Sequence, residues 1–200
     1  MSRGRTLLLV DIGFKLATAL LLLIAVVFPD LPQFEGKAFG SRAIAYPLAT
    51  ILIPAAWLIR DRRSAFPVIA DLLWTLPFVI DTAGNAVDLY DSIGWWDDAN
   101  HFFNWMLLSG SFVALVRPRI GRSWELAGLC IGFGATTAIL WELLEYWTFI
   151  RDSPELTTAY KDTLGDLALG LSGSAVTAAL AGWWSDRRPA LTPRPGNLRP

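Results

Sequence analysis

The stretch WWDDANHFFNWMLLSGSFVALV, residues 95–116, joins a polar beginning to a long apolar run. Its length is close to the roughly 20 residues that a helix needs to cross a bilayer. Near its beginning lie two acidic residues, Asp97 and Asp98, and the only histidine of the chain, His101. Ionisable side chains are costly inside a membrane unless they find partners, water or a ligand. The stretch therefore predicts a membrane helix whose polar end carries a function.

The rest of the chain has the composition of a membrane protein. Of its 200 residues, 54% are hydrophobic and ten are tryptophan, and the mean hydropathy is +0.42. The 17 basic and 18 acidic residues give a net charge of -1 and gather in short bands between apolar runs. Such banding is typical of polytopic membrane proteins, and the balanced charge argues against a nucleic-acid partner. One cysteine excludes an internal disulfide, and one histidine excludes a histidine-rich zinc site.

We expect an all-α, polytopic membrane protein, a bundle of six transmembrane helices within one domain, residues 1–186. The first span is expected to be retained, because it is too long for a signal peptide and no small-residue cleavage site follows it. The proline-rich tail, residues 187–200, is expected to be disordered in the cytoplasm. The apolar runs place the spans at about 6–28, 43–60, 66–89, 98–116, 124–149 and 161–184.

Arginine residues indicate how the spans are oriented, because basic-rich ends of membrane helices face the cytoplasm. The opposite ends are rich in acids and carry few cations, among them Lys37 and Arg42. We therefore expect both termini inside and the acidic ends outside. The arginines that fall at alternate ends of the spans are Arg3, Arg5, Arg60, Arg62, Arg63, Arg117, Arg119, Arg122, Arg187 and Arg188.

Polar residues recur at helical spacing in the last four spans, three or four positions apart and in the outer half of each span. These residues are Asp81 and Asn85 in the third span, Asp97, His101 and Asn104 in the fourth, Glu142 and Glu145 in the fifth, and Asp162 and Asp166 in the sixth. Since they lie at similar depths, we predict that they share one pocket that opens to the outside.

Simpler interpretations exist for some of these residues. Asp97 lies at a helix start, where a carboxylate caps free N–H groups and favours the helix dipole, and Asp162 can do the same. An isolated histidine such as His101 is more often a packing residue than a ligand. Capping does not explain Asp81 and Glu142, which lie within spans, so these two favour a function or an essential polar network.

Two features of the inner half are expected to be structural. Asp11 and Lys15 are four residues apart in the first span and can pair with each other. Asp71 lies near the inner end of the third span, within reach of the cytoplasmic arginines.

A histidine with carboxylates from several helices suits a hard or borderline divalent ion such as Mg²⁺, Mn²⁺ or Fe²⁺, which can activate water. A desolvated Glu142 or Glu145 can also exchange protons without a metal. The chain has no G-x-S-x-G elbow, H-E-x-x-H pair or Walker loop. The predicted metal ligands are His101, Glu142, Glu145, Asp162 and Asp166. The predicted catalytic residues are Glu142, as the base, and His101, and the predicted ligand-binding residues are Asp81, Asn85, Asp97 and Asn104.

The order of these motifs resembles that of a known family, the DUF2238 or YjdF-like inner-membrane proteins, and is more distantly similar to VanZ-like proteins. The resemblance implies a bacterial, multi-pass protein of the plasma (inner) membrane and implies no established activity. The motifs that carry it, over roughly residues 70–175, are Asp81-x3-Asn85, Trp96-Asp97-Asp98-x2-His101-Phe102, Trp141-Glu142-x2-Glu145 and Asp162-Thr163-x2-Asp166.

Three functions are compatible with this sequence. The first is a metal-assisted hydrolase or transferase, whose outward-facing acidic site acts on a lipid or envelope-linked substrate. The second is a non-enzymatic accessory subunit or binding protein of a membrane complex, in which the polar network fixes helix packing. The third is a proton or cation transporter. It ranks last because only Asp71 and the Asp11–Lys15 pair offer polar steps through the inner half.

Overall fold

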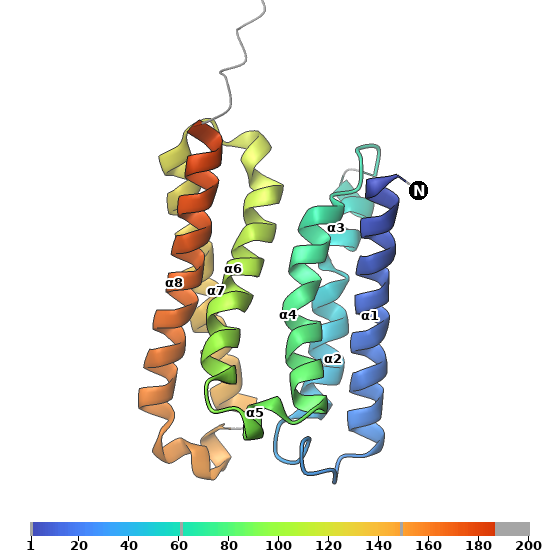
Figure 1. Ribbon diagram of the computed structural model, residues 1–200, viewed down its shortest axis with the longest axis vertical. Coiled ribbons are helices and arrows are strands. Elements are labelled where there is room, and N and C mark those ends of the chain that lie inside the picture. The colour runs from blue at the N-terminus through green and yellow to red at the C-terminus, as the bar shows by residue number, and fades with distance from the viewer. Residues whose placement is uncertain (1, 61, 149, 187–200) are drawn as a thin grey trace, which may run out of the picture.

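The computed structural model describes residues 2–60, 62–148 and 150–186, and within them all regular structure is helical. The long helices lie side by side along one axis (Figure 1). The tail, residues 187–200, lies outside the described residues, so its disorder stays a prediction. The expected all-α class is confirmed.

The N-terminal half of the bundle contains α1 (Arg3–Val27), α2 (Phe39–Thr50), α3 (Leu52–Arg60) and α4 (Val68–Ala86). Helices α2 and α3 follow each other directly, with a break at Ile51. Pro54 lies in the first turn of α3 and has no N–H to donate to the carbonyl of Thr50, so the hydrogen-bond ladder is interrupted there. Together the two helices occupy the second predicted span.

The C-terminal half contains α6 (Trp96–Val116), α7 (Ser123–Thr148) and α8 (Ala159–Asp186), with short turns η1 (Arg117–Arg119), η2 (Ile150–Asp152) and η3 (Pro154–Thr157) between them. Helix α8 packs against both α6 and α7, α1 packs against α4, and the contact between α4 and α6 joins the two halves. The short helix α5 (Leu89–Ser92) crosses from one half to the other at the end opposite the N-terminus (Figure 1).

Small residues allow the helices of the C-terminal half to approach closely. Gly173 of α8 lies against the backbone of Phe102 in α6, where a Cβ would overlap the carbonyl oxygen. Gly134 of α7 lies against the side chain of Ser174 in the same way. The hydroxyl of Ser109 in α6 donates to Ser174 Oγ at 2.9 Å. Close approach through small residues with hydrogen bonds across the interface is typical of membrane helices.

An ionic cluster fixes α1 to α4 at the end of the bundle away from α5. Lys15 Nζ lies 2.8 Å from Asp11 Oδ2 on its own helix and 2.5 Å from Asp71 Oδ2 on α4. Both carboxylates are only 1% exposed. The expected pairing of Asp11 with Lys15 is confirmed. Asp71 pairs with Lys15 rather than with one of the arginines at the helix ends, because α1 and α4 pack along their length.

The outer surface of the bundle is apolar. Leu16, Ile59 and Leu180 are more than half exposed, whereas many fully buried side chains are polar. The remaining predicted spans fall on α4 and α6, whose buried polar residues include Asp71, Asp81, Asn85, Asn100 and Asn104. These are features of a multi-pass membrane protein that contacts lipid. The stretches long and apolar enough to cross a membrane are, within the described part of the chain, these four: Arg3–Val27, Phe39–Arg60, Ser123–Asp152 and Ala159–Trp184.

Candidate functional site

A cavity of about 400 Å³ lies between the two halves of the bundle, at the end where α5 crosses. One wall is formed by α2, α4 and α5, and the other by α6, α7 and α8. Charged side chains line its mouth, and aromatic and aliphatic side chains line the part nearer the middle of the bundle. The latter include Trp74, Phe78, Trp105 and Leu108.

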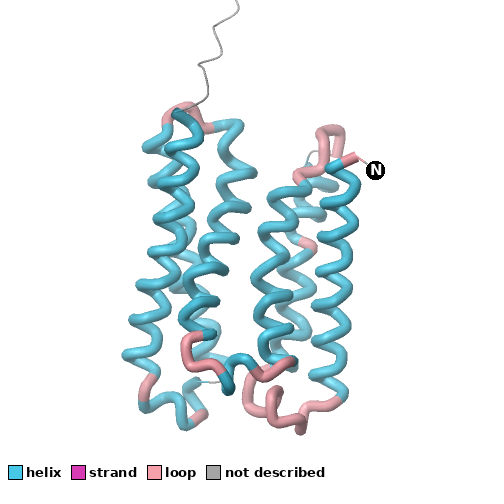
Figure 2. Tube along the Cα trace, in the orientation of Figure 1, coloured by secondary structure: helices cyan, strands magenta, loops and turns pink. Residues whose placement is uncertain are grey.

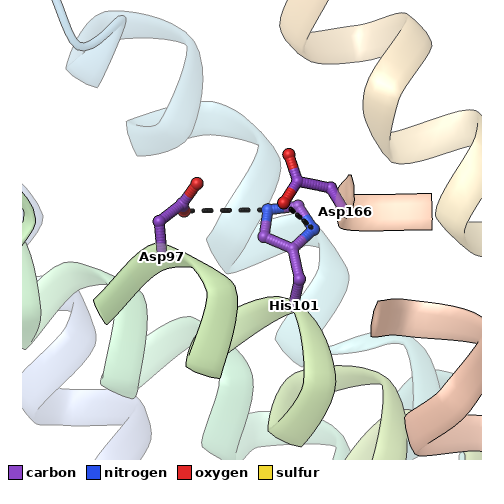
Figure 3. A group of neighbouring side chains, drawn as sticks. All are labelled: Asp97, His101 and Asp166. Atoms are coloured by element: carbon purple, nitrogen blue, oxygen red, sulfur yellow. Dashed lines mark ion pairs between the residues drawn. The ribbon is translucent and has the colours of Figure 1, made fainter. Parts of the chain in front are cut away.

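His101 is at the centre of the α6–α8 wall, one turn into α6. Its side chain is buried, and its ring stacks on Trp105 with the ring centroids 5.6 Å apart. The Nε2 atom lies 3.7 Å from Asp97 Oδ1, and Nδ1 lies 3.7 Å from Glu142 Oε1 and 3.8 Å from Asp166 Oδ1. Figure 3 shows the imidazole between Asp97 and Asp166. Both ring nitrogens therefore face carboxylates.

The surrounding carboxylates differ in exposure. Glu142 is 7% exposed and Asp166 is 4% exposed, while Glu145 and Asp97 are half-buried. One ligand atom each from His101, Glu142 and Glu145 lie within 4.8 Å of one another, and so do one each from Asp97, His101 and Asp166. The spacing of Glu142 and Glu145, three apart on α7, turns both carboxylates toward the same side. Three helices thus direct carboxylates at one imidazole.

Asp81 lies on the opposite wall, where several donors surround it. Its Oδ2 accepts hydrogen bonds from Arg42 Nη1 at 2.5 Å and from the Tyr46 hydroxyl at 2.7 Å. Its Oδ1 accepts one from the Tyr90 hydroxyl at 2.9 Å and a longer one from Asn85 Nδ2 at 3.4 Å. Burial, followed by the charge of Asp81, raises the pKa of Tyr90 well above its ordinary value, so Tyr90 remains a donor.

A second pair of opposite charges lies at the mouth. Lys37 Nζ donates to Asp91 Oδ2 at 2.5 Å, and this hydrogen bond holds the pKa of Asp91 below its ordinary value. Lys37 is paired with Asp91 and Arg42 with Asp81, so neither cation forms an ion pair with the other acids that line the cavity. The acids that line the cavity besides Asp81 and Asp91 are Asp97, Glu145, Glu155 and Asp162. The cavity lining therefore contains more acidic than basic side chains.

Two amides line the cavity beside His101. Asn100 Nδ2 donates to the carbonyl of Trp96 at 2.8 Å, and Asn104 Nδ2 donates to Asn100 Oδ1 at 3.4 Å. Asn104 Oδ1 is buried and has no hydrogen-bond partner among the described residues. A buried carbonyl oxygen without a partner is costly, so this atom suits a donor or a cation supplied by a ligand.

Residues 13–187 match the model of a family described as "Predicted membrane protein (DUF2238)". The chain belongs to the DUF2238 family. This confirms the resemblance seen in the sequence, whereas the distant similarity to VanZ-like proteins is not shown and stays a prediction. A search of curated proteins and a search of solved structures find no match. Both walls of the cavity lie within the part of the chain that matches the DUF2238 family.

The predicted site residues of this DUF2238 protein fall into three groups in the structure. Around the imidazole of His101 lie the carboxylates of Asp97, Glu142, Glu145 and Asp166. Asp162 lines the mouth, where it is exposed one turn from Asp166, and Asn104 lies beside His101. Asp81 and Asn85 lie on the other wall and bind each other and the donors around them. Most of the predicted residues therefore line one cavity, divided between its two walls, whereas Glu142 and Asp166 are buried beside His101 and are not among the lining residues.

Arg42 and Tyr46 are cavity residues that the sequence analysis missed. Arg42 is grouped there with the cations outside the spans, although it lies inside α2. Its spacing of four from Tyr46 puts both on one face of a helix, and this was the available signal. Asp97 is also more than a helix cap, because its carboxylate faces His101 and the N-cap residue of α6 is Trp95.

Proposed function

We propose that this DUF2238 protein crosses the bacterial plasma membrane six times, with both termini in the cytoplasm and the cavity open to the outside. The beginning of α1 and the end of α8 lie at the same end of the bundle, as an even number of crossings requires (Figure 1). The α3–α4 and α6–α7 connections, which carry arginines, lie at that end too (Figure 2). Arginine-rich connections favour the cytoplasmic side.

The cavity is proposed to hold one divalent metal ion beside His101 Nδ1, with Glu142 and Glu145 as oxygen ligands, because one ligand atom from each of these three residues lies within 4.8 Å of the other two. Two ligand atoms on opposite sides of an ion at about 2.1 Å are about 4.2 Å apart, and closer at other angles. The distance of 3.7 Å from Nδ1 to Glu142 fits this limit, whereas Asp166 groups with Asp97 and His101 and not with Glu142 and Glu145. Asp97 would then accept the Nε2–H and fix the tautomer and ring orientation, as carboxylates beside metal-bound histidines do. This pairing of a buried imidazole with carboxylates on both sides carries the proposal.

Hydrolysis or group transfer is the chemistry that such a site supports. A bound divalent ion lowers the pKa of water and polarises a carbonyl or phosphoryl oxygen. Glu145 lies within reach of the same ligand atoms and is half-buried, so it or Glu142 can accept the proton of an attacking water. Stacking on Trp105 holds the imidazole of His101 in place during these steps. Asn104 Oδ1 can accept a hydrogen bond from the substrate.

A lipid or an envelope-linked amphiphile is the substrate that suits the shape of the cavity. Trp74, Pro77, Phe78 and Leu108 line its inner part. Leu140 and Leu144 of α7 also line it, and both are exposed on the surface of the bundle. The cavity therefore borders on the lipid-facing side as well as on the mouth, and an apolar chain can extend in that direction.

Mn²⁺ binding to the purified protein tests this proposal, with the free ion followed by electron paramagnetic resonance. The wild type is expected to bind one Mn²⁺ per chain. Glu142→Gln should weaken binding by more than the roughly 10–100-fold that loss of an outer partner costs. Glu125→Gln is the matched control, because Glu125 lies on the same helix and pairs with Arg122 at its other end. The metal site would be refuted if the wild type did not bind Mn²⁺. It would also be refuted if Glu142→Gln and His101→Ala both bound Mn²⁺ as tightly as the wild type.

A second candidate is a non-enzymatic accessory or binding subunit whose polar network fixes helix packing. The four donors around Asp81 favour it, because they join α2, α4 and α5. In that case Glu142→Gln and His101→Ala should lower the unfolding temperature in detergent, and the wild type should retain no metal. Metal analysis and thermal unfolding of the same preparations distinguish the two functions.

A further inference from the structure

Arg42 is held rigidly on the cavity wall that faces the proposed metal ligands. Its guanidinium donates to Asp81 at 2.5 Å, and its Cζ lies 5.4 Å from the ring centroid of Phe39 and 5.9 Å from that of Tyr46. The side chain is only 13% exposed, and it lines the cavity. A guanidinium fixed in this way is already oriented before a ligand arrives, which reduces the entropy lost on binding.

Donors remain on this wall after the internal pairs are formed. A guanidinium has five N–H donors and an ammonium has three. Among the described residues the structure gives Arg42 one hydrogen-bond acceptor, Asp81, and gives Lys37 one, Asp91. Both side chains line the same cavity as His101. A ligand between the walls would therefore meet N–H donors on one side and the proposed metal ion on the other.

We propose, on the basis of the proposed metal site, that the substrate carries a phosphate group, which binds between the metal ion and Arg42, and that its apolar chain lies against Trp74 and Phe78. A phosphate has enough oxygens to coordinate an ion and to accept a forked pair of hydrogen bonds from arginine at the same time. Ions such as Mg²⁺ are commonly bound through carboxylates together with substrate phosphates. The ion also offsets the excess acid on the α6–α8 wall, which would otherwise repel an anion.

The proposal predicts that phosphate and metal bind cooperatively and that Arg42 mediates the cooperativity. Mn²⁺ affinity of the purified protein is measured without additions, with inorganic phosphate, and in nanodiscs that contain either phosphatidic acid or only phosphatidylcholine. Phosphatidic acid should raise the Mn²⁺ affinity of the wild type by about tenfold, within the usual range of coupling between sites. Arg42→Lys keeps the charge, loses the forked geometry, and should abolish most of this rise without changing the affinity for Mn²⁺ alone. Arg151→Lys, at an exposed arginine outside the cavity, should behave as the wild type.

The possible outcomes separate the two proposals. A rise with phosphatidic acid but not with inorganic phosphate supports a lipid phosphate, and a rise with both supports a phosphate that binds without its chain. The phosphate proposal is refuted if Mn²⁺ binds but phosphatidic acid raises its affinity equally in the wild type and in Arg42→Lys. It is also refuted if phosphatidic acid raises the affinity in neither protein. In both cases the metal site stands. If the wild type binds no Mn²⁺, both are refuted. Should Arg42→Lys fail to fold, Arg42→Gln with Asp81→Asn removes both charges of the pair and must show the same loss.

Discussion

Replacement of Lys15 by methionine is expected to be among the most destabilising single substitutions in this protein. Lys15 is the cation shared by Asp11 and Asp71, and both carboxylates are 1% exposed. Methionine fills a similar volume but leaves two buried carboxylates without a positive partner. Removal of one member of a buried ion pair costs about 3–5 kcal/mol, because the remaining charge is buried without compensation. We expect a loss in this range for Lys15→Met.

Asp71→Asn should be much milder, although it removes a partner of the same cluster. The cluster has two acids and one base, so this change makes it neutral and leaves Lys15 paired with Asp11. The new amide oxygen still accepts a hydrogen bond from Lys15, so the cost should stay below the value of about 1.5 kcal/mol for losing a weak charged hydrogen bond. The order of the two variants follows from the charge balance of the cluster.

Steric-trap unfolding in bicelles measures both free energies of unfolding under the same conditions. Lys161→Met is the matched control, because Lys161 is exposed at the start of α8 and its loss should change stability by about 0.5 kcal/mol or less. Equal losses for Lys15→Met and Asp71→Asn, or a loss for Lys15→Met no larger than that of the control, would refute the reasoning. The folded fraction of Lys15→Met should still bind Mn²⁺ as the wild type does, because the cluster lies at the other end of α4 from the cavity.

Three further predictions concern packing, pH and the proposed metal. Gly173→Ala should cost about 1–3 kcal/mol through overpacking against α6, whereas Gly182→Ala, with open space around it, should be neutral; equal unfolding temperatures would contradict the close approach. Because Lys37 lowers the pKa of Asp91, this pair stabilises the fold above the ordinary carboxyl pKa of about 4, and the contribution disappears as pH falls through the lower folded value. A scan of unfolding temperature against pH should show a small decline there that Lys37→Met removes, and an unchanged decline would refute the pairing. Asp97→Asn should weaken Mn²⁺ binding by about 10–100-fold, as loss of an orienting partner does, and unchanged affinity in the same titration would exclude that role.

The helical frame could be predicted from the sequence, and its main difference from the structure has a physical cause. The second span is predicted to begin at residue 43, where the apolar run starts after Arg42. An arginine inside a membrane helix is costly. In the structure α2 begins at Phe39 and contains Arg42. Asp81 on α4 and the ring of Tyr46 offset that cost. Such a partner, almost 40 residues away along the chain, is not visible in the local pattern.

The candidate site was also predictable from the sequence only in part. The meeting of His101, Glu142 and Asp166 could be predicted, because three helices carry them at similar depths near the same end of the bundle. The rotation of each helix about its axis could not be predicted from depth alone. This rotation leaves Asp162 exposed at the mouth and turns Asp81 toward Arg42 on the other wall. Periodicity shows which residues share a face of one helix, but not which neighbouring helix that face meets.

Helix α4 is the element that connects the two ionic features of the N-terminal half. Asp71 near one end binds Lys15 of α1, and Asp81 near the other end binds Arg42 of α2. Each of the two acids thus forms an ion pair with a different helix, so α4 is held to α1 near one end and to α2 near the other. The two ion pairs that hold α4 to α1 and α2 therefore lie within the N-terminal half of the bundle.

The distance between the two cavity walls then depends on how α4 meets α6. At the end away from the cavity, the hydroxyl of Ser111 in α6 donates to the carbonyl of Ala70 in α4 at 2.7 Å. At the cavity end, Trp96 of α6 lies against Gly84 of α4, where a Cβ would be 2.7 Å from the indole nitrogen. No larger side chain fits at Gly84 unless the two helices separate or Trp96 moves. Gly84 therefore allows α4 and α6 to approach each other closely beside the cavity.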